Sequence, residues 1–385
     1  MRVGISGYVG NKLTGIGRVL ICVLTELARQ HPENEYIVFR NFDFKEYDCL
    51  EQYSNIRLID VPYTKESGLK NIIWHQWLYQ RLLKKYKCDL AYIPNFTLLL
   101  WKTVPTIVTI HDLIEFNVPE KFSKARMMYR KFLADPLMAK RSDHILTVSQ
   151  SSYNDIVKYL KVNPNKITIT PNATNKKFFK IYTQAEVESV ITDYQLKYKD
   201  YLLFVGTIDY PGKNIKTVIE AFYNLRSKGE LKSKKLVIIG KNGFNSEVIY
   251  EYVNKSPFCK DVIFTGYLKD EDLPKYYAGA EIMLYLSLYE GFGLPVLEAM
   301  SCATPVICPN TSCFPEIVEE LDVCVSPTDV QAVENKILMI TKNKDYAEAL
   351  SNSCYVKSLK YDWKKSAEIY HNVFQNITNH INKSN

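Results

Sequence analysis

The sequence has no uninterrupted apolar run that approaches the roughly 20 residues that a membrane-spanning helix needs. Residues Met1–Gly7 have the pattern of a short strand rather than the basic stretch and apolar run of a signal peptide. The nine cysteines include no Cys-x-x-Cys pair, and no histidine pair lies near their closest group, Cys302, Cys308 and Cys313. These absences predict a soluble cytoplasmic protein whose cysteines are buried thiols rather than zinc ligands.

The chain has 385 residues, which is longer than a domain with a single hydrophobic core usually is, so we expect two domains. The charge is uneven, because the first 180 residues carry 27 Lys and Arg against 16 Asp and Glu, whereas the rest carry 22 against 26. A basic N-terminal half favours an anionic partner: a phospholipid surface, a lipid-linked phosphate or nucleic acid. The sequence offers no stacking motif or recognition helix, so we do not expect nucleic-acid binding.

Short β-branched runs alternate with helical patterns along the whole chain, which is typical of an α/β protein with parallel sheets covered by helices. The expected strands are Arg2–Ser6, Glu35–Arg40, Ile56–Val61, Asp89–Ile93, Thr106–His111, His144–Ser149, Lys166–Thr170, Tyr201–Val205, Lys235–Ile239, Val262–Thr265, Ile282–Leu286, Pro305–Cys308 and Val323–Val325.

This alternation runs twice, with a break across the polar stretch 172–200. It predicts two doubly wound, Rossmann-like domains, one at 1–178 and one at 179–360. Ligands of such sheets bind beyond the carboxyl ends of the strands, so we expect the active site in a cleft between the domains.

The most informative segment follows the expected strand at Ile282–Leu286. Two glycines and Pro295 lead into a helix whose N-terminus can receive an anion, and glycine lets the backbone approach a ligand. Glu290 in the loop and Glu298 in the first helical turn can accept bonds from sugar hydroxyls. Together these features describe a site for a nucleotide sugar, although an ordinary turn with two solvated glutamates has the same pattern.

The two glutamates, separated by seven residues, resemble the signature of glycosyltransferase family 4. The resemblance covers nearly the whole chain and implies the GT-B fold, a retaining reaction, no metal and no cofactor beyond the nucleotide-sugar substrate. It also implies that the N-terminal domain at 1–178 binds the acceptor, that the C-terminal domain at 179–360 binds the donor, and that a C-terminal helix in 361–385 crosses back to the first domain. By this resemblance, Glu290 contacts the donor sugar, Glu298 holds the ribose, and the sugar hydroxyls and phosphate meet the amides of Gly291, Phe292, Gly293 and Leu294.

A second glycine-containing segment follows the first expected strand and opens a helix. Gly15-Ile16-Gly17-Arg18 lacks the third glycine of a dinucleotide fingerprint, because position 20 is Leu, and alone it also fits a tight turn. In the family, a glycine loop at this point approaches the donor diphosphate, and Gly15, Gly17 and Arg18 match it.

His111 stands at the carboxyl end of an apolar strand, which points it to the crevice rather than the core, although a lone histidine is often structural. The family has a histidine here that touches the donor sugar. Asp112 could orient this ring or cap the segment that follows.

Lys213 precedes a helix at Asn214 and can offer a point charge to a diphosphate, or lie solvated in a Pro-Gly turn. The family usually pairs this lysine with an arginine, but the two matching positions are Thr207 and Gly212. This departure leaves open how the leaving group is neutralised, with Arg18 and the helix N-terminus as candidates. Together with His111 and Glu290, Lys213 forms our predicted catalytic set, and Thr207 is a donor-binding candidate.

Tyr267 and Leu268 end another expected strand, where the family contacts the base of the nucleotide. Tyr267 could stack on that base or pack within the protein. Both complete the predicted donor-binding residues.

Two segments interleave cations with aromatic or Met side chains, namely 68–87, with Trp74, Trp77 and Tyr79, and 121–141, with Met127, Met128 and Phe132. Such helices can lie on an anionic bilayer, each nearby cation contributing about 1 kcal/mol, but core helices with solvated outer faces look alike. The hypothesis is a peripheral contact of the basic domain with the inner face of the membrane, where it reaches a lipid-linked acceptor.

The resemblance is nearest to mannosyl- and rhamnosyltransferases of O-antigen and capsule assembly. It implies a hexosyltransferase whose first candidate donor is GDP-mannose, with dTDP-rhamnose or a UDP-sugar as alternatives, and whose acceptor is a glycan or a lipid-linked molecule. A catalytically silent GT-B partner subunit is the non-enzyme alternative, and the missing arginine favours it.

Overall fold

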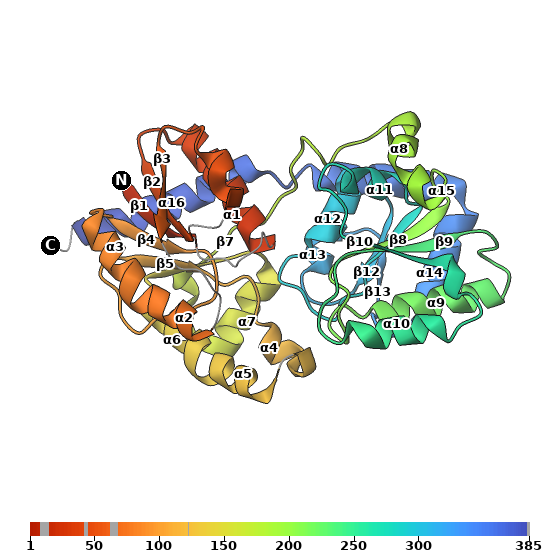
Figure 1. The fold of residues 1–385 in the computed structure, drawn as a ribbon, viewed down its shortest axis with the longest axis horizontal. Coiled ribbons are helices and arrows are strands. Elements are labelled where there is room, and N and C mark those ends of the chain that lie inside the picture. The colour runs from red at the N-terminus through yellow and green to blue at the C-terminus, as the bar shows by residue number, and fades with distance from the viewer. Residues whose placement is uncertain (8–14, 42–44, 62–67, 122, 383–385) are drawn as a thin grey trace. The chain divides into compact units, whose positions relative to one another are not determined.

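The computed structural model describes residues 1–7, 15–41, 45–61, 68–121 and 123–382, which form two compact units (Figure 1). The first unit comprises Met1–Phe116, Phe122–Asn172 and Asp362–Asn385, and the second comprises Asn117–Lys121 and Ala173–Tyr361. The main divisions, after residues 172 and 361, lie a few residues from those expected after 178 and 360.

A parallel sheet of seven strands forms the centre of the first unit, in the order β3-β2-β1-β4-β5-β6-β7. The strands are β1 (Arg2–Ser6), β2 (Glu35–Asn41), β3 (Ile56–Val61), β4 (Leu90–Ile93), β5 (Thr106–Thr109), β6 (His144–Thr147) and β7 (Ile167–Ile169). The chain adds strands outward from β1 to β3 and then returns to the other side of β1, so the strand order reverses between β1 and β4.

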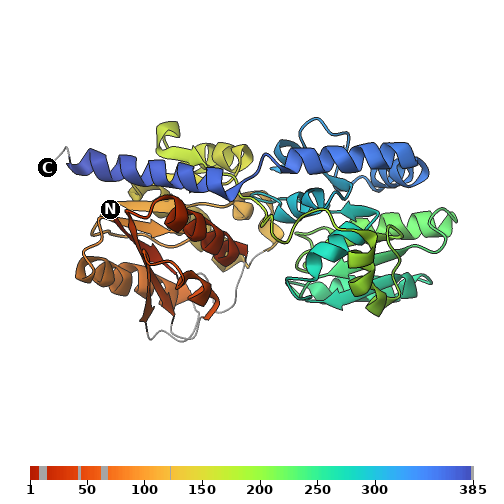
Figure 2. The same cartoon turned by 90° about the horizontal axis from the view of Figure 1, so that it is seen from above.

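Helices lie on both faces of this sheet (Figure 1). They are α1 (Gly15–Gln30), α2 (Gly68–Ile73), α3 (Tyr79–Lys85), α4 (Ile114–Asn117), α5 (Lys124–Tyr129), α6 (Asp135–Arg141), α7 (Gln150–Leu160) and α16 (Trp363–Asn382). The C-terminal helix α16 packs along α1, and Figure 2 shows the two helices side by side. The chain thus ends in its first unit.

Two helical segments of this unit contain a widened, π-helical turn. One turn, Trp74–Leu78, joins α2 to α3, and the other, Arg130–Ala134, joins α5 to α6. Pro136 therefore stands in the first turn of α6, where its missing N–H costs little. The helical path continues past this proline.

The large side chains of these two segments divide between core and surface. Trp74, Tyr79 and Met138 are buried in one hydrophobic cluster, whereas Trp77 and Phe132 are 58% and 76% exposed. Only the outward faces of the two segments are therefore available to a membrane surface.

The second unit has a six-stranded parallel sheet in the order β10-β9-β8-β11-β12-β13, which reverses between β8 and β11. Its strands are β8 (Tyr201–Val205), β9 (Lys235–Ile239), β10 (Val262–Gly266), β11 (Ile282–Leu284), β12 (Val306–Pro309) and β13 (Cys324–Val325). Its helices are α8 (Gln184–Ile191), α9 (Ile215–Ser227), α10 (Ser246–Asn254), α11 (Leu273–Gly279), α12 (Leu294–Ser301), α13 (Phe314–Val318), α14 (Val330–Lys342) and α15 (Lys344–Ser358).

The predicted α/β class and all the predicted strands are confirmed. The differences lie at strand ends: β5 ends at Thr109, so His111 stands in the loop beyond the strand rather than at its last residue. The polar stretch expected as a break contains helix α8. Among the described residues, no helix combines the length and the apolar character needed to cross a bilayer.

Candidate active site

Two loops of the second unit meet where the strand order of its sheet reverses. β8 and β11 are neighbours in the sheet, although β9 and β10 lie between them in sequence. The loop after β8 carries Lys213, and the loop after β11 carries Glu290. Because adjacent parallel strands end at the same edge, the sheet brings together two side chains that are 77 residues apart.

Lys213 and Glu290 form an ion pair through Nζ and Oε1. Lys213 Nζ also donates to the hydroxyl of Tyr285 at 2.9 Å, and that hydroxyl donates to Glu290 Oε1 at 2.9 Å. Ser287 Oγ donates to the same Oε1 at 2.7 Å. The side chains of Lys213 and Glu290 are only 15% and 19% exposed, so this network lies largely away from water.

Both members of the pair are charged at neutral pH. Burial would raise the pKa of Glu290, but the charge of Lys213 and the bonds from Lys213 and Ser287 outweigh burial and lower that pKa. Burial likewise opposes the charge of Lys213, and the Glu290 carboxylate outweighs it and raises the pKa of Lys213. The pair can thus offer a cation to a diphosphate and an acceptor to sugar hydroxyls.

The backbone around Glu290 is fixed by contacts on both sides. The Glu290 N–H donates to Ser312 Oγ at 3.2 Å, and the Ser312 hydroxyl donates to Glu290 O at 2.5 Å. Gly293 has a φ of +77°, and a Cβ on it would lie 2.7 Å from Phe314 Cε1. Only glycine fits both demands, and the chain turns there from the buried Gly291 and Phe292 into Leu294, the first residue of α12.

Glu298 lies in the second turn of α12, not in the first as the sequence predicts, because the helix begins at Leu294. Its Oε2 accepts a hydrogen bond at 2.8 Å from the hydroxyl of Tyr277. Burial and then the charge of Glu298 raise the pKa of Tyr277, so the phenol keeps its proton and acts as the donor. The predicted role of Glu298 at the ribose stays a prediction.

The turn before Lys213 is organised by Asp209. Asp209 Oδ1 accepts the backbone N–H of Lys213 at 2.8 Å, and Asp209 Oδ2 pairs with Lys121, which belongs to the same unit, at 3.3 Å. A Cβ on Gly212 would lie 2.9 Å from Asp209 Oδ1. Thr207, the other position without the expected arginine, is half-buried just after β8.

Tyr267 and Leu268 follow β10, an edge strand that lies two places from β8 in the sheet. Tyr267 is 66% exposed and donates its hydroxyl to Asp270 Oδ1 at 2.8 Å. Tyr267 is therefore exposed to solvent instead of packed inside the protein.

The remaining predicted residues belong to the first unit. His111 Nε2 lies 2.9 Å from the carbonyl oxygen of Pro94, and burial lowers the pKa of His111, so the neutral ring donates there. Asp112 Oδ1 accepts the N–H of Ile114 at 3.2 Å, which is the capping contact offered as one of its two roles. The first turn of α1, beyond the end of β1, contains Gly15, Gly17 and Arg18.

Sequence reasoning does not identify the hydroxyl groups that hold the predicted carboxylates. These are Tyr285, Ser287 and Ser312 around Glu290, and Tyr277 beside Glu298. A signal exists for Tyr285 and Ser287, because they are polar residues directly after a buried strand at the sheet edge that binds ligands. Tyr277 and Ser312 do not directly follow a strand near Glu290 in the sequence, so no sequence pattern marks them as neighbours of the two glutamates.

Both halves of the chain match models of glycosyltransferase families. The model described as Glycosyltransferase Family 4 matches residues 13–178, and the model described as Glycosyl transferases group 1 matches residues 193–356. O-antigen chain mannosyltransferase B of Escherichia coli is 30% identical over 91% of this chain and 93% of its own length. O-antigen chain mannosyltransferase RfbU of Salmonella typhimurium is 29% identical over 78% of each protein.

A solved structure agrees in fold. Sucrose-phosphate synthase of Thermosynechococcus elongatus superposes with a TM-score of 0.77 at 20% identity and covers 98% of each chain. This likeness supports the GT-B architecture of two nucleotide-binding-type sheets. Taken with the family matches over both halves, it shows that the chain belongs to glycosyltransferase family 4 and is an enzyme of the hexosyltransferase class with the GT-B fold.

Proposed function

We propose that this enzyme transfers a hexose with retention of anomeric configuration and without a metal ion. The donor is a nucleotide-diphosphate sugar, and the acceptor is a glycan or lipid-linked molecule in surface polysaccharide synthesis. GDP-mannose is the first candidate donor, since two similar proteins are named O-antigen mannosyltransferases. A dTDP-rhamnose or UDP-sugar donor is the alternative.

The ion pair of Lys213 and Glu290 carries this proposal. In the complex, Lys213 binds the diphosphate, Glu290 accepts a hydroxyl of the donor sugar, and Glu298 binds the ribose. The turn at Gly291 to Leu294 brings backbone amides to the same ligand, and the start of α12 favours its negative charge.

The reaction follows from this placement. The acceptor oxygen attacks C1 of the sugar from the face that the nucleotide leaves. A C1–O bond to the acceptor forms as the C1–O bond to the diphosphate breaks, and a departing phosphate oxygen takes the proton of the acceptor. Negative charge grows on the diphosphate, where a lysine held away from water stabilises it, so no protein nucleophile is needed.

Two substitutions test the site. We expect Glu290→Ala and Lys213→Ala each to lower kcat by about 100-fold or more. Lys234→Met is the matched control, because Lys234 pairs with Glu281 at 2.8 Å in the same unit, with side-chain exposures of 21% and 18%, and should keep full turnover. Unchanged turnover in both active-site variants would show that the site is elsewhere.

A donor panel tests the chemistry. EDTA-treated enzyme is supplied with GDP-mannose, dTDP-rhamnose and UDP-hexoses, and NMR reports the anomeric configuration of the product. We expect one donor to be used with its configuration kept and with no loss of rate in EDTA. A chain that binds a partner transferase but neither transfers nor hydrolyses any donor would instead be a silent subunit.

The first unit is proposed to contact the inner face of the membrane. Met128 and Phe132 are 63% and 76% exposed, and the neighbouring Lys124 and Arg126 are also exposed. Flotation with anionic vesicles should recover the enzyme, and Phe132→Glu should weaken recovery, while Ile181→Glu, at an exposed position of the second unit, should not. Equal recovery with neutral and anionic vesicles would refute the contact.

A further inference from the structure

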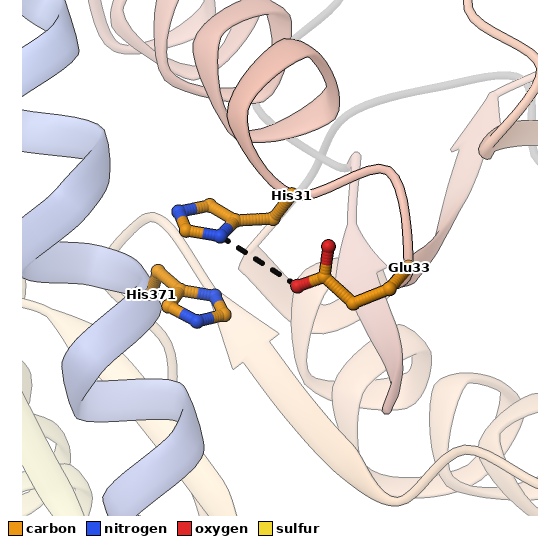
Figure 3. A group of neighbouring side chains, drawn as sticks. All are labelled: His31, Glu33 and His371. Atoms are coloured by element: carbon orange, nitrogen blue, oxygen red, sulfur yellow. Dashed lines mark ion pairs between the residues drawn. The ribbon is translucent and has the colours of Figure 1, made fainter.

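A group of imidazole and carboxylate side chains lies where the end of α1 meets α16 in the first unit. Figure 3 shows His31 just after α1, Glu33 in the turn that follows, and His371 on α16. None of these residues takes part in the predicted active site.

The group has two ligand-bearing segments. One is His31-Pro32-Glu33 in the turn before β2, where His31 Nδ1 lies 3.6 Å from Glu33 Oε1. The other is on α16, where Glu368 and His371 are three residues apart and therefore share a face. Glu368 Oε2 lies 3.2 Å from His31 Nε2, so Glu368 holds the His31 ring through one nitrogen while the other nitrogen, Nδ1, faces Glu33.

The potential ligand atoms of His31, Glu33 and His371 lie near one another. One potential ligand atom from each of His31, Glu33 and His371 lies within 4.8 Å of the other two. The amide nitrogen of Asn34 lies 3.0 Å from Glu33 Oε1 and 3.4 Å from His371 Nδ1, so it bridges these two side chains and keeps them close.

We propose that His31, Glu33 and His371 bind one Zn²⁺ ion, with water in the fourth position. Two imidazoles, one carboxylate and a water form a donor set that zinc accepts in four-coordinate sites. The side chains of Glu33 and Glu368 are 61% and 52% exposed, so the ion can enter from solvent.

Binding requires a small rearrangement of side chains. The donors of a tetrahedral zinc site lie roughly 3.3 Å apart, given Zn–N distances near 2.0–2.1 Å, so the three donors draw together. The rings of His31 and His371 stack with centroids 3.4 Å apart and planes 3° apart, and parallel rings direct their lone pairs side by side. At least one ring therefore turns about its χ angles when the ion binds.

The site has a structural consequence. His31 and Glu33 stand before the second strand of the chain, whereas Glu368 and His371 stand near its end, so zinc would tie α16 to the first unit. Since the ion binds the folded arrangement and not the separated segments, its binding free energy adds to the stability of that unit. The transfer reaction itself does not use this ion.

Zinc binding to the full chain tests the proposal. Protein stripped with EDTA is titrated with Zn²⁺ against a chromophoric chelator, and we expect one ion per chain and a higher Tm. His371→Gln and His31→Gln should each weaken the affinity by at least about tenfold and remove the rise in Tm. His144→Gln is the matched control, because His144 is bonded to Thr168 at 2.8 Å in the same unit, and it should bind as the wild type does.

Cobalt distinguishes this group from the cysteines without any substitution. Co²⁺ bound here should give visible bands of a four-coordinate site with no thiolate-to-metal charge-transfer band. Three results would overturn the proposal: no zinc bound by the folded wild-type protein, binding unchanged in both histidine variants, or a thiolate band in the cobalt spectrum.

Discussion

The pair of Lys213 and Glu290 makes a quantitative prediction about stability. Removing one partner of a buried ion pair costs about 3–5 kcal/mol, because the other charge stays buried without compensation. Here the side chains of Lys213 and Glu290 are still 15% and 19% exposed, and the Tyr285 and Ser287 hydroxyls still donate to the carboxylate after Lys213 is removed. We therefore expect Lys213→Met to cost about 2–3 kcal/mol.

The assay is thermal unfolding of the single variants and of the double variant with Glu290→Gln. A unit of this size loses about 2–4 °C in Tm for each kcal/mol, so Lys213→Met should lower the transition of the second unit by about 4–12 °C. The double variant contains no uncompensated charge and should lose less than the two single variants together, by about 1–2 kcal/mol. Additive losses would show that the two side chains do not interact.

The stability difference between the wild type and Lys213→Met should also depend on pH. In the wild type, the lowered pKa of Glu290 means that its stabilising contribution is present above its unfolded pKa and is lost as the pH falls through the folded pKa. Without Lys213, only the Ser287 hydrogen bond and the charge of Lys121 oppose the burial of Glu290, so we expect its folded pKa to rise above the unfolded one. The deficit of Lys213→Met should then shrink between pH 7 and pH 5 as Glu290 takes up a proton, and a deficit that grows on acidification would refute this reasoning.

Three further predictions concern single positions. Tyr277→Phe removes the hydroxyl that donates a hydrogen bond to Glu298, so it should raise the KM for the nucleotide sugar by about 3–10-fold with little change in kcat. The control is Tyr201→Phe, which removes a buried hydroxyl that donates to Tyr276 O and should leave this KM unchanged. Gly293→Ala places a side chain at a positive φ and against Phe314, so it should lower the free energy of unfolding by about 2–4 kcal/mol, measured by thermal unfolding. The control is Gly229→Ala, which should cost clearly less because its φ is also positive, at +75°, but a Cβ there would have no neighbour within 4 Å. Because burial lowers the pKa of His111, the ring is neutral above about pH 6.5, and a pH–rate profile should show no inflection from it between pH 7 and pH 8.

Sequence reasoning reaches the fold because each strand is a short apolar run that parallel sheets bury on both faces. Val3 and Ile5 of β1, for example, are fully buried. It also finds Lys213 and Glu290 as single residues, since each follows a strand. It does not show that they form a pair, because that depends on β8 and β11 being neighbours across the reversal of strand order.

Two other features cannot be predicted from the sequence, for different reasons. The helical path past Pro136 depends on a π-helical turn just before it, which absorbs the missing hydrogen bond and has no local sequence mark. Tyr277 is bonded to Glu298 only because α11 packs beside α12. Contacts of this kind are set by packing between elements rather than by the order of residues within one element.

The structure shows what surrounds Gly212, one of the two positions without the expected arginine. At Gly212 a Cβ would lie 2.9 Å from Asp209 Oδ1, an oxygen that is buried and held by the backbone N–H of Lys213. A larger residue there would require Asp209 or the end of the Lys121 side chain to shift. Lys121 pairs with the same Asp209, and its charge helps to lower the pKa of Glu290, so a second cation already reaches this turn. A lysine from a different segment thus supplies positive charge beside a position where the contact with Asp209 disfavours an arginine.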